Sequence, residues 1–230
     1  MYILALETTG PHASVAIINE EGKVVENSSD AVLNHLQHLM PMTQELLEKS
    51  GLQLGDMTAI AASQGPGSFT GIRIGVSSAR ALAQVMDMPT IAVPTLKSFA
   101  YNAPEFDGLI CPVFDARRSQ VYAGAYRWVD GQIVEVVEGA PYSIDEFVEK
   151  TAQTGLPRMI FGDGIKAYGD HFSPEEIAPE EIRLQVASSV AKLAKDMYEA
   201  GETVHYELLK PNYMRKAEAE RKLAEKGGKC

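Results

Sequence analysis

The sequence predicts an α/β protein built from two similar halves, and three observations lead to this prediction. Each half opens with an apolar strand that ends in an acidic residue, Glu7 in one half and Asp115 in the other. A short polar turn and a return strand follow each acid, as in an antiparallel hairpin. Between the two hairpins, a glycine-rich turn joins an apolar run to a helix. Strands that alternate with helices along a chain are typical of the α/β class.

Length, composition and charge limit the classes of function that the chain can have. Its 230 residues suffice for one large domain or two small ones, and 45% hydrophobic with 23% charged residues is ordinary for a globular protein. The net charge of −10 argues against a protein that grips nucleic acid alone, since phosphate binding requires clustered lysine and arginine. A partner that carries an RNA site remains open.

The cysteines and the N-terminus favour a reducing compartment. Cys111 lies in an apolar run and Cys230 is the last residue, so they form neither a disulfide framework nor a CxxC metal pair. The chain begins with a very short apolar run before its first charge, which predicts a strand and not a signal peptide. No window reaches the length of a membrane span. We therefore expect a cytoplasmic protein with no membrane contact.

The first half is predicted to contain a meander of three strands followed by alternating helices and strands. The helix near residues 34–50 is indicated by apolar residues spaced three and four apart, and Gly51 ends it. Pro41 lies inside this helix and predicts either a kink there or a helix that is regular only after it. The predicted strands are 2–6, 14–18, 24–26, 57–62 and 90–93, and the further helices run to about residue 86 and from 95 to 101.

A loop at residues 102–108 is the predicted boundary, and the strand pattern of the N-terminus returns after it. We expect one subdomain from residues 1–103, joined by the C-terminal segment 209–230, and a second from residues 104–208. The predicted strands of the second half are 109–114, 120–126, 132–137 and 159–161, and its helices are 144–151 and 188–200; a further helix with mixed charge is predicted at 217–226.

The stretch at residues 64–75 combines a strand end, a glycine-rich turn and a helix start. This order often makes a phosphate site, because free N–H groups and the helix dipole meet there. However, no lysine follows the glycines, and neither the phosphate-loop spacing nor the G-x-G-x-x-G fingerprint is present. The stretch therefore does not predict a nucleotide site of either kind.

Small residues recur at every fourth position from this turn into the helix. They are Gly67, Gly71, Gly75, Ala79 and Ala83. On a helix, this spacing places them on one face that another element can approach closely. Two interpretations stay open: packing against the protein's own sheet, or a surface for another protein. The second interpretation predicts that Gly75→Leu leaves the stability of the isolated chain almost unchanged.

Five stretches resemble the bacterial TsaB (YeaZ) family, accessory proteins of tRNA threonylcarbamoyladenosine biosynthesis. They lie at residues 3–9, 35–41, 64–75, 114–122 and 210–215, and the GPGSFTG motif at 65–71 is the most specific of them. The resemblance implies the duplicated fold of actin-like and sugar-kinase-like ATPases, which the two acid-ended hairpins and the halved chain also favour. Between about residues 138 and 205 it rests on little beyond a Gly-Asp-Gly turn at 162–164.

The resemblance also implies a function without catalysis. It predicts a scaffold that forms a heterodimer with the TsaD transferase, which modifies adenosine 37 of ANN-decoding tRNAs, and that recruits the TsaE ATPase. The apolar face of Gly71, Gly75 and Ala79, lined by Ile72 and Val76, predicts a homodimer when the chain is alone. We further expect contact with tRNA only through the complex, and no cofactor. The expected partner interface comprises His35, His38, Met42, Ser68, Gly71, Ile72, Gly75, Val76, Ala79 and Ala83.

An older alternative is a glycopeptidase-like metalloprotein. The similar enzyme TsaD holds its metal with an H-x-x-x-H pair, and the matching helix here contains His35 and His38. The position four residues after His35 is Leu39, and no third ligand is evident nearby. We therefore expect no metal at this pair.

A second alternative is an actin-like ATPase or small-molecule kinase. In such enzymes an acid on the first hairpin holds a magnesium-bound water and the turns cradle phosphates, and Glu7, Thr8 and Thr9 have the matching positions. The second turn contains Asp115, but also the bulky cations Arg117 and Arg118. We favour a salt-bridged turn there and treat all six residues as a vestigial or interfacial nucleotide site.

Overall fold

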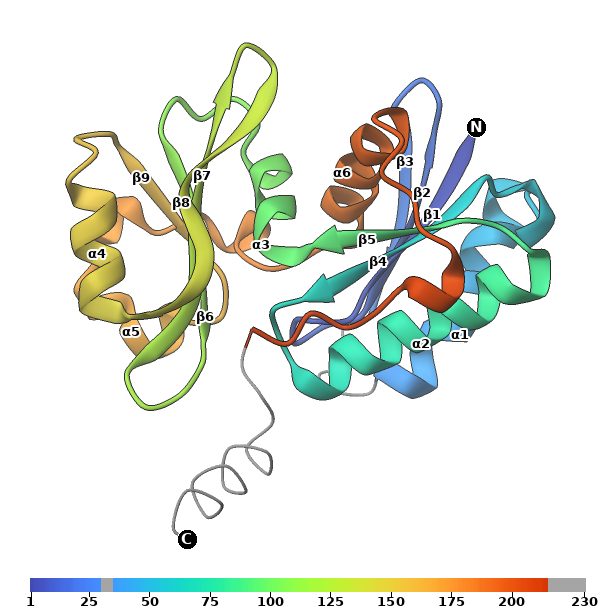
Figure 1. The fold of residues 1–230 in the computed structure, drawn as a ribbon, viewed down its shortest axis with the longest axis horizontal. Helices are drawn as coiled ribbons and strands as arrows, with labels where there is room; N and C mark the ends of the chain where they lie inside the picture. The colour runs from blue at the N-terminus through green and yellow to red at the C-terminus, as the bar shows by residue number, and fades with distance from the viewer. Residues whose placement is uncertain (30–34, 215–230) are drawn as a thin grey trace, which may run out of the picture.

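The computed structural model describes residues 1–29 and 35–214, with only the backbone of residues 35 and 36, and it contains two β-sheets (Figure 1). The first sheet has the order β3-β2-β1-β4-β5 and the second has the order β8-β7-β6-β9. The strands of the first are β1 (Tyr2–Glu7), β2 (Ser14–Asn19), β3 (Val24–Ser28), β4 (Ala59–Gly65) and β5 (Thr90–Pro94). The strands of the second are β6 (Leu109–Asp115), β7 (Gln120–Val129), β8 (Gln132–Ser143) and β9 (Arg158–Phe161).

The two sheets repeat one topology. β1 pairs antiparallel with β2 and parallel with β4, and β6 pairs antiparallel with β7 and parallel with β9. Each half is thus a three-stranded meander with a further strand parallel to its first strand. The predicted duplicated fold is confirmed by this repetition.

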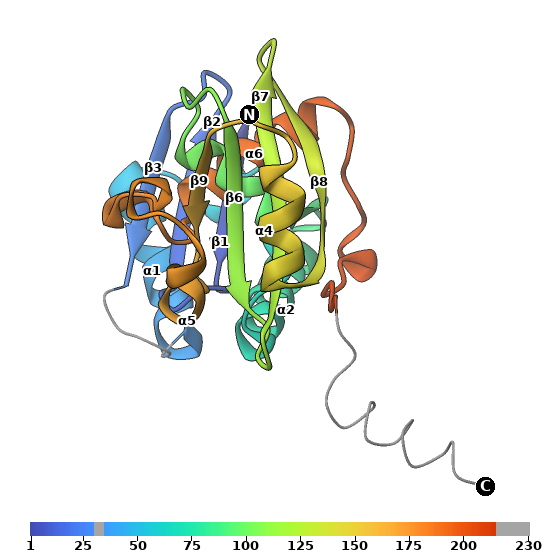
Figure 2. The ribbon, with the colours of Figure 1, turned by 90° about the vertical axis from the view of Figure 1, so that its left-hand side faces the viewer.

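Helices cover both faces of each sheet (Figures 1 and 2). On the first sheet, α1 (His35–Ser50) and α2 (Phe69–Met86) lie on one face and α6 (Ala187–Glu199) lies on the other. On the second sheet, α4 (Ile144–Ala152) and α5 (Ile165–Tyr168) lie on one face, and α3 (Thr95–Ser98) continues into η2 (Phe99–Asn102) on the other. The remaining short turns are η1 (Leu54–Asp56), η3 (Gly169–His171), η4 (Pro174–Glu176), η5 (Glu180–Ile182) and η6 (Tyr206–Leu208).

The strand sequences explain why both faces are covered. In β1, Leu4 and Leu6 point to the α1–α2 side, while Ile3 and Ala5 pack against α6, because side chains alternate along a strand. All four side chains are fully buried. A strand that is apolar at every position requires a helix layer on each face.

The chain returns to the first sheet earlier than expected. Val190 and Leu193 of α6 pack into the first sheet, so α6 completes the first half and not the second. The expected boundary at residue 208 is therefore wrong, because the apolar face of β1 needs this helix as cover. The helix predicted at 217–226 lies outside the described residues, and α1 continues through Pro41 as one helix.

The face of small residues on α2 packs inside the protein. Ala79 and Ala83 are fully buried, and a Cβ atom added to Gly71 or Gly75 would lie 1.9 Å from the Thr8 carbonyl oxygen or 2.4 Å from the Thr8 hydroxyl oxygen. Ile72 and Val76 on α2 and Met42 on α1 belong to the same core cluster. The expectation that this face is exposed to a partner is wrong, because the β1–β2 turn already occupies it.

No helix in residues 1–29 and 35–214 is long and apolar enough to cross a membrane.

We predict that Gly71→Ala lowers the free energy of unfolding by at least about 1–3 kcal/mol, because the new methyl group meets backbone that side-chain rotation cannot relieve. Urea denaturation measures this loss. Gly75→Leu, which the sequence predicted to leave stability almost unchanged, should also lower the free energy of unfolding, because its Cβ would meet Thr8. Gly169→Ala is the control, since its Cβ would lie at an ordinary 3.6 Å from the Ile165 side chain. Equal stability of the two alanine variants would contradict the close contact.

Candidate functional site

The two acid-ended turns lie at the same edge of the molecule, at the lower side of Figure 1. Glu7 ends β1 and Asp115 ends β6, so the repeated topology gives them equivalent positions in the two halves. In α/β proteins, ligands commonly bind at the carboxyl ends of strands. The surroundings of each acid therefore decide what this edge can bind.

Glu7 is fully buried, and its carboxylate is bound by its own chain. The backbone N–H and the hydroxyl group of Thr9 donate to one oxygen, and the Ser63 hydroxyl donates to the other. Burial raises the pKa of the Glu7 carboxyl above its ordinary value of 4.5, and the hydrogen bonds from Ser63 and Thr9 act in the opposite direction. The structure thus gives this acid a role inside the protein and no access to a bound ligand.

The glycine-rich turn closes the first hairpin turn from outside. The Ser68 N–H donates to the Thr9 carbonyl over 2.8 Å, and the Thr8 hydroxyl donates to the Gly71 carbonyl over 2.7 Å. A Cβ on Gly67 would lie 2.6 Å from the Thr9 Cβ atom, so only glycine permits this approach. Ser68 also caps α2 by accepting the Gly71 N–H. The backbone that would cradle a phosphate is therefore covered by residues 67–71.

The second turn is a salt-bridged hairpin turn, as favoured from the sequence. Asp115 accepts the backbone N–H of Arg117 over 2.7 Å, and its other oxygen lies 3.4 Å from the Arg117 guanidinium. The Tyr168 hydroxyl donates to the same carboxylate over 3.2 Å. Arg117, Arg118 and Ser119 all have positive φ, between 56° and 66°. Such backbone costs energy for residues other than glycine and fixes a tight turn.

The Gly-Asp-Gly turn after β9 has a packing role. A Cβ on Gly162 or Gly164 would lie 2.4 or 2.7 Å from the Val113 carbonyl oxygen, so both glycines allow the turn to lie against β6. The Asp163 side chain between them is exposed. The close packing on β6 therefore explains both glycines of this motif.

The histidine pair is only partly described. His38 lies half-buried on α1, whereas the side chain of His35 lies outside the described structure. Leu39, at the position of the second metal ligand in the similar enzyme, is buried in the core. No group of three His, Cys, Asp or Glu side chains within the described ranges is arranged to hold a metal ion.

Sequence reasoning missed a cluster at the start of α2. The Arg73 guanidinium lies 4.0 Å from the centre of the Phe69 ring and donates to the Tyr213 hydroxyl over 2.8 Å. The Phe69 and Tyr213 rings lie 4.8 Å apart. The spacing of four residues between Phe69 and Arg73 predicts that they are neighbours on one helix face. Nothing in the sequence pairs them with Tyr213. This cluster ties the C-terminal segment to the outer face of α2.

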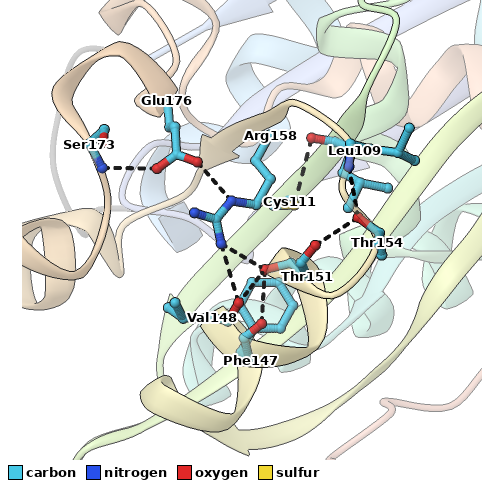
Figure 3. A network of polar contacts seen from close by, with 10 residues as sticks. Leu109, Cys111, Phe147, Val148, Thr151, Thr154, Arg158, Ser173 and Glu176 are labelled. Carbon is cyan, nitrogen blue, oxygen red and sulfur yellow. Dashed lines mark hydrogen bonds and ion pairs between the residues drawn. The ribbon is translucent and has the colours of Figure 1, made fainter.

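A separate polar network in the second half is structural (Figure 3). Arg158 donates to the Glu176 carboxylate over 2.7 Å and to the Val148 carbonyl and the Thr151 hydroxyl over 3.3 and 3.1 Å. The Ser173 N–H donates to the second oxygen of Glu176. Both charged side chains are largely buried and use their hydrogen bonds within the network, which joins β9, α4 and η4.

We predict that the stability difference between Glu7→Gln and the unmodified chain depends on pH. A raised folded-state pKa means that the stabilisation by Glu7 is complete below its unfolded pKa and is lost as pH rises through its folded pKa. The free energy of unfolding of Glu7→Gln, relative to the unmodified chain, should therefore increase as pH rises. Urea denaturation from about pH 4 to pH 8 measures it. Glu105→Gln, at an exposed residue, is the control. A difference that falls with rising pH would contradict the raised pKa.

Comparison with known proteins gives consistent matches over nearly the whole chain. A family model described as "TsaD: tRNA N6-adenosine threonylcarbamoyltransferase" matches residues 23–223. The chain is 33% identical over 232 residues to the "tRNA threonylcarbamoyladenosine biosynthesis protein TsaB" of Bacillus subtilis (strain 168), covering 98% of this chain and 99% of that protein. It is also 33% identical to the protein of the same name from Escherichia coli (strain K12), covering 97% and 98%.

A solved structure shows the same architecture. The crystal structure of an uncharacterized protein with similarity to peptidase YEAZ from Pseudomonas aeruginosa superimposes with a TM-score of 0.83 at 28% identity, covering 93% of this chain and 99% of that one. The resemblance stated from the sequence is confirmed. The chain belongs to the family that the TsaD model describes and, within it, to the TsaB (YeaZ) family.

Proposed function

We propose that this chain is a non-catalytic scaffold subunit for threonylcarbamoyl transfer to adenosine 37 of ANN-decoding tRNAs. Its family membership gives it a role in the threonylcarbamoyladenosine modification of tRNA. The proposal adds three statements to this role: the chain acts as a scaffold, it forms a heterodimer with the TsaD transferase, and it recruits the TsaE ATPase.

The closed first turn carries the proposal. An actin-like ATPase or kinase would need Glu7 and the backbone of Thr8 and Thr9 to face a nucleotide. All three residues are buried, and residues 67–71 lie against Thr8 and Thr9. A metal-dependent peptidase would need a second ligand where Leu39 instead packs in the core. These observations support a subunit that acts by binding other proteins, with no cofactor of its own.

The outer faces of α1 and α2 are the proposed partner surface. The inner face of α2 is buried, so a partner can contact only the exposed side chains of the helix, among them Arg73, Ser77 and Ala81. Met40 on α1 and Val85 and Met86 on α2 are 38%, 78% and 39% exposed. Exposed apolar side chains, methionine among them, beside an arginine are typical of interfaces. Of the residues expected there, His35, His38 and Ser68 remain in the proposal.

The likeness of the chain to the TsaD family model supports a heterodimer of two similar subunits. Two related folds can pair through equivalent helices about an approximate twofold axis, as identical subunits do in an isologous dimer. The same surface would pair with a second copy when the chain is alone. In this proposal TsaE joins the assembled heterodimer, and tRNA is bound only by the complex.

We predict that reconstituted tRNA modification requires this chain although the chain alone turns over no ATP. The assay supplies tRNA and an activated threonylcarbamoyl donor to TsaD and TsaE of the same organism, and it measures the threonylcarbamoyladenosine formed with and without the chain. The Glu7→Gln variant should support modification nearly as well as the unmodified chain, because this carboxyl is sealed inside the fold. Robust ATP turnover by the isolated chain, abolished by Glu7→Gln, would overturn the scaffold role.

We predict that Ser77→Trp weakens binding to TsaD, and self-association, by about 10- to 100-fold, because a large side chain at a close helix contact costs roughly 1–3 kcal/mol. The melting temperature should change little, since Ser77 is exposed. Calorimetry with TsaD and light scattering of the free chain measure the two effects. Glu149→Trp, on the exposed side of α4, is the matched control. Equal binding by both variants would exclude this face as the interface.

A further inference from the structure

The junction between the two halves is formed by elements on their inner faces. The segment α3–η2 packs on the inner face of the second sheet, and α6 packs on the inner face of the first. Figure 1 shows α3 and α6 between the two sheets, and the two elements contact each other. The relative position of the halves therefore depends on how η2 is held against α6.

Two consecutive polar residues of η2 bind the first half. The Tyr101 hydroxyl donates to the Asp196 carboxylate of α6. The Asn102 amide donates to the Ile182 and Leu184 carbonyls over 2.6 and 3.1 Å, and its oxygen accepts the Ser189 hydroxyl of α6. Asn102 thereby holds both the segment that returns to the first half and the start of α6.

An aromatic contact continues this link into the second half. The Trp128 ring of β7 meets the Tyr101 ring edge to face, with centroids 5.1 Å apart at 80°, and its indole N–H donates to the Ala100 carbonyl over 2.9 Å. The Tyr101 ring also packs against the core cluster of the first half. Burial raises the pKa of the Tyr101 phenol, and the Asp196 carboxylate adds to this effect, so the phenol remains a donor at neutral pH.

A second tie lies at the other end of the junction. The stretch at residues 204–214 pairs with β5 through Val204 and Thr90, and it buries Leu209 fully in the core of the first half. The Asn212 N–H then donates to the Gln64 carbonyl over 2.7 Å, and Met214 packs against the inner cluster of the second half. The halves are thus joined at two separate places besides their direct connections.

We propose that Tyr101, Asn102, Trp128, Ser189 and Asp196 form a junction clasp that locks the two halves at one fixed angle. Hinged enzymes open and close about a few residues that absorb large backbone changes. Here the connecting segment is packed on both sides, and its polar groups are bound to both halves. The chain is therefore a rigid platform, a property beyond the scaffold role, since a scaffold can also be hinged.

The test measures the distance between the halves in the full chain. Spin labels are attached to Glu48→Cys on α1 and Glu149→Cys on α4, both exposed, with Cys230→Ser; Cys111 is buried. Labelled chain is diluted with an excess of unlabelled chain, so that pairing of two copies through α1 and α2 adds no distance between labels on different molecules. Pulsed electron paramagnetic resonance should then give one narrow distance distribution, unchanged by magnesium ATP. The double variant Tyr101→Phe, Asn102→Ala should broaden it and populate open junctions at least about tenfold more, since a hydrogen bond to a charged group is lost.

Controls separate opening from unfolding. Tyr142→Phe also removes one hydroxyl, which donates to the Glu138 carbonyl within the second half, and should leave the distribution narrow. A label pair at Glu20→Cys and Glu48→Cys, both in the first half, should not change in the double variant. A broad distribution in the unmodified chain, or a narrow one in a folded double variant, would overturn the clasp. Both distance measurements use this chain without TsaD or TsaE, so their outcome is independent of the tRNA modification assay.

Discussion

The rest of the structure depends on one close approach, that of the first turn of α2 to the β1–β2 turn. The Thr8 hydroxyl and the Gly71 carbonyl are hydrogen-bonded, and no side chain fits between the Thr8 carbonyl and Gly71. This contact seats α2 on the sheet with its small residues inward. It also covers the β1–β2 turn, which follows Glu7. The same contact therefore keeps this turn buried and determines which side of α2 faces solvent.

Most of the fold follows from patterns that are local in the sequence. The strands, the two meanders and the helices are encoded by apolar runs and spacings, and the duplicated topology follows from the two acid-ended hairpins. The sheet on which α6 packs does not follow from a local pattern. Its own sequence does not say which sheet it covers, and it packs on the face of β1 that carries Ile3 and Ala5. A subdomain boundary at residue 208, placed by chain order alone, therefore assigns α6 to the wrong half.

The site was predictable in its residues but not in their orientation. A run of small residues at every fourth position predicts a close contact but does not identify the element that makes it. In the structure that element is the β1–β2 turn, whose Thr8 lies against Gly71 and Gly75 where a partner protein was expected. Asp115 with Arg117 was foreseen because both lie in one tight turn. The Tyr213 contact with Arg73 joins residues 140 positions apart, and no local pattern reports such a pair.

The early return of the chain to the first sheet has a consequence for synthesis. The core beside β1 and β5 is completed by α6, and Val204 pairs with Thr90 at the edge of β5. A ribosome-bound chain that ends before Ala187 therefore exposes one apolar face of its first sheet while the second half is already available to fold. Folding of the first half must wait for the last part of the chain, and nascent or truncated forms are the species that need protection from aggregation.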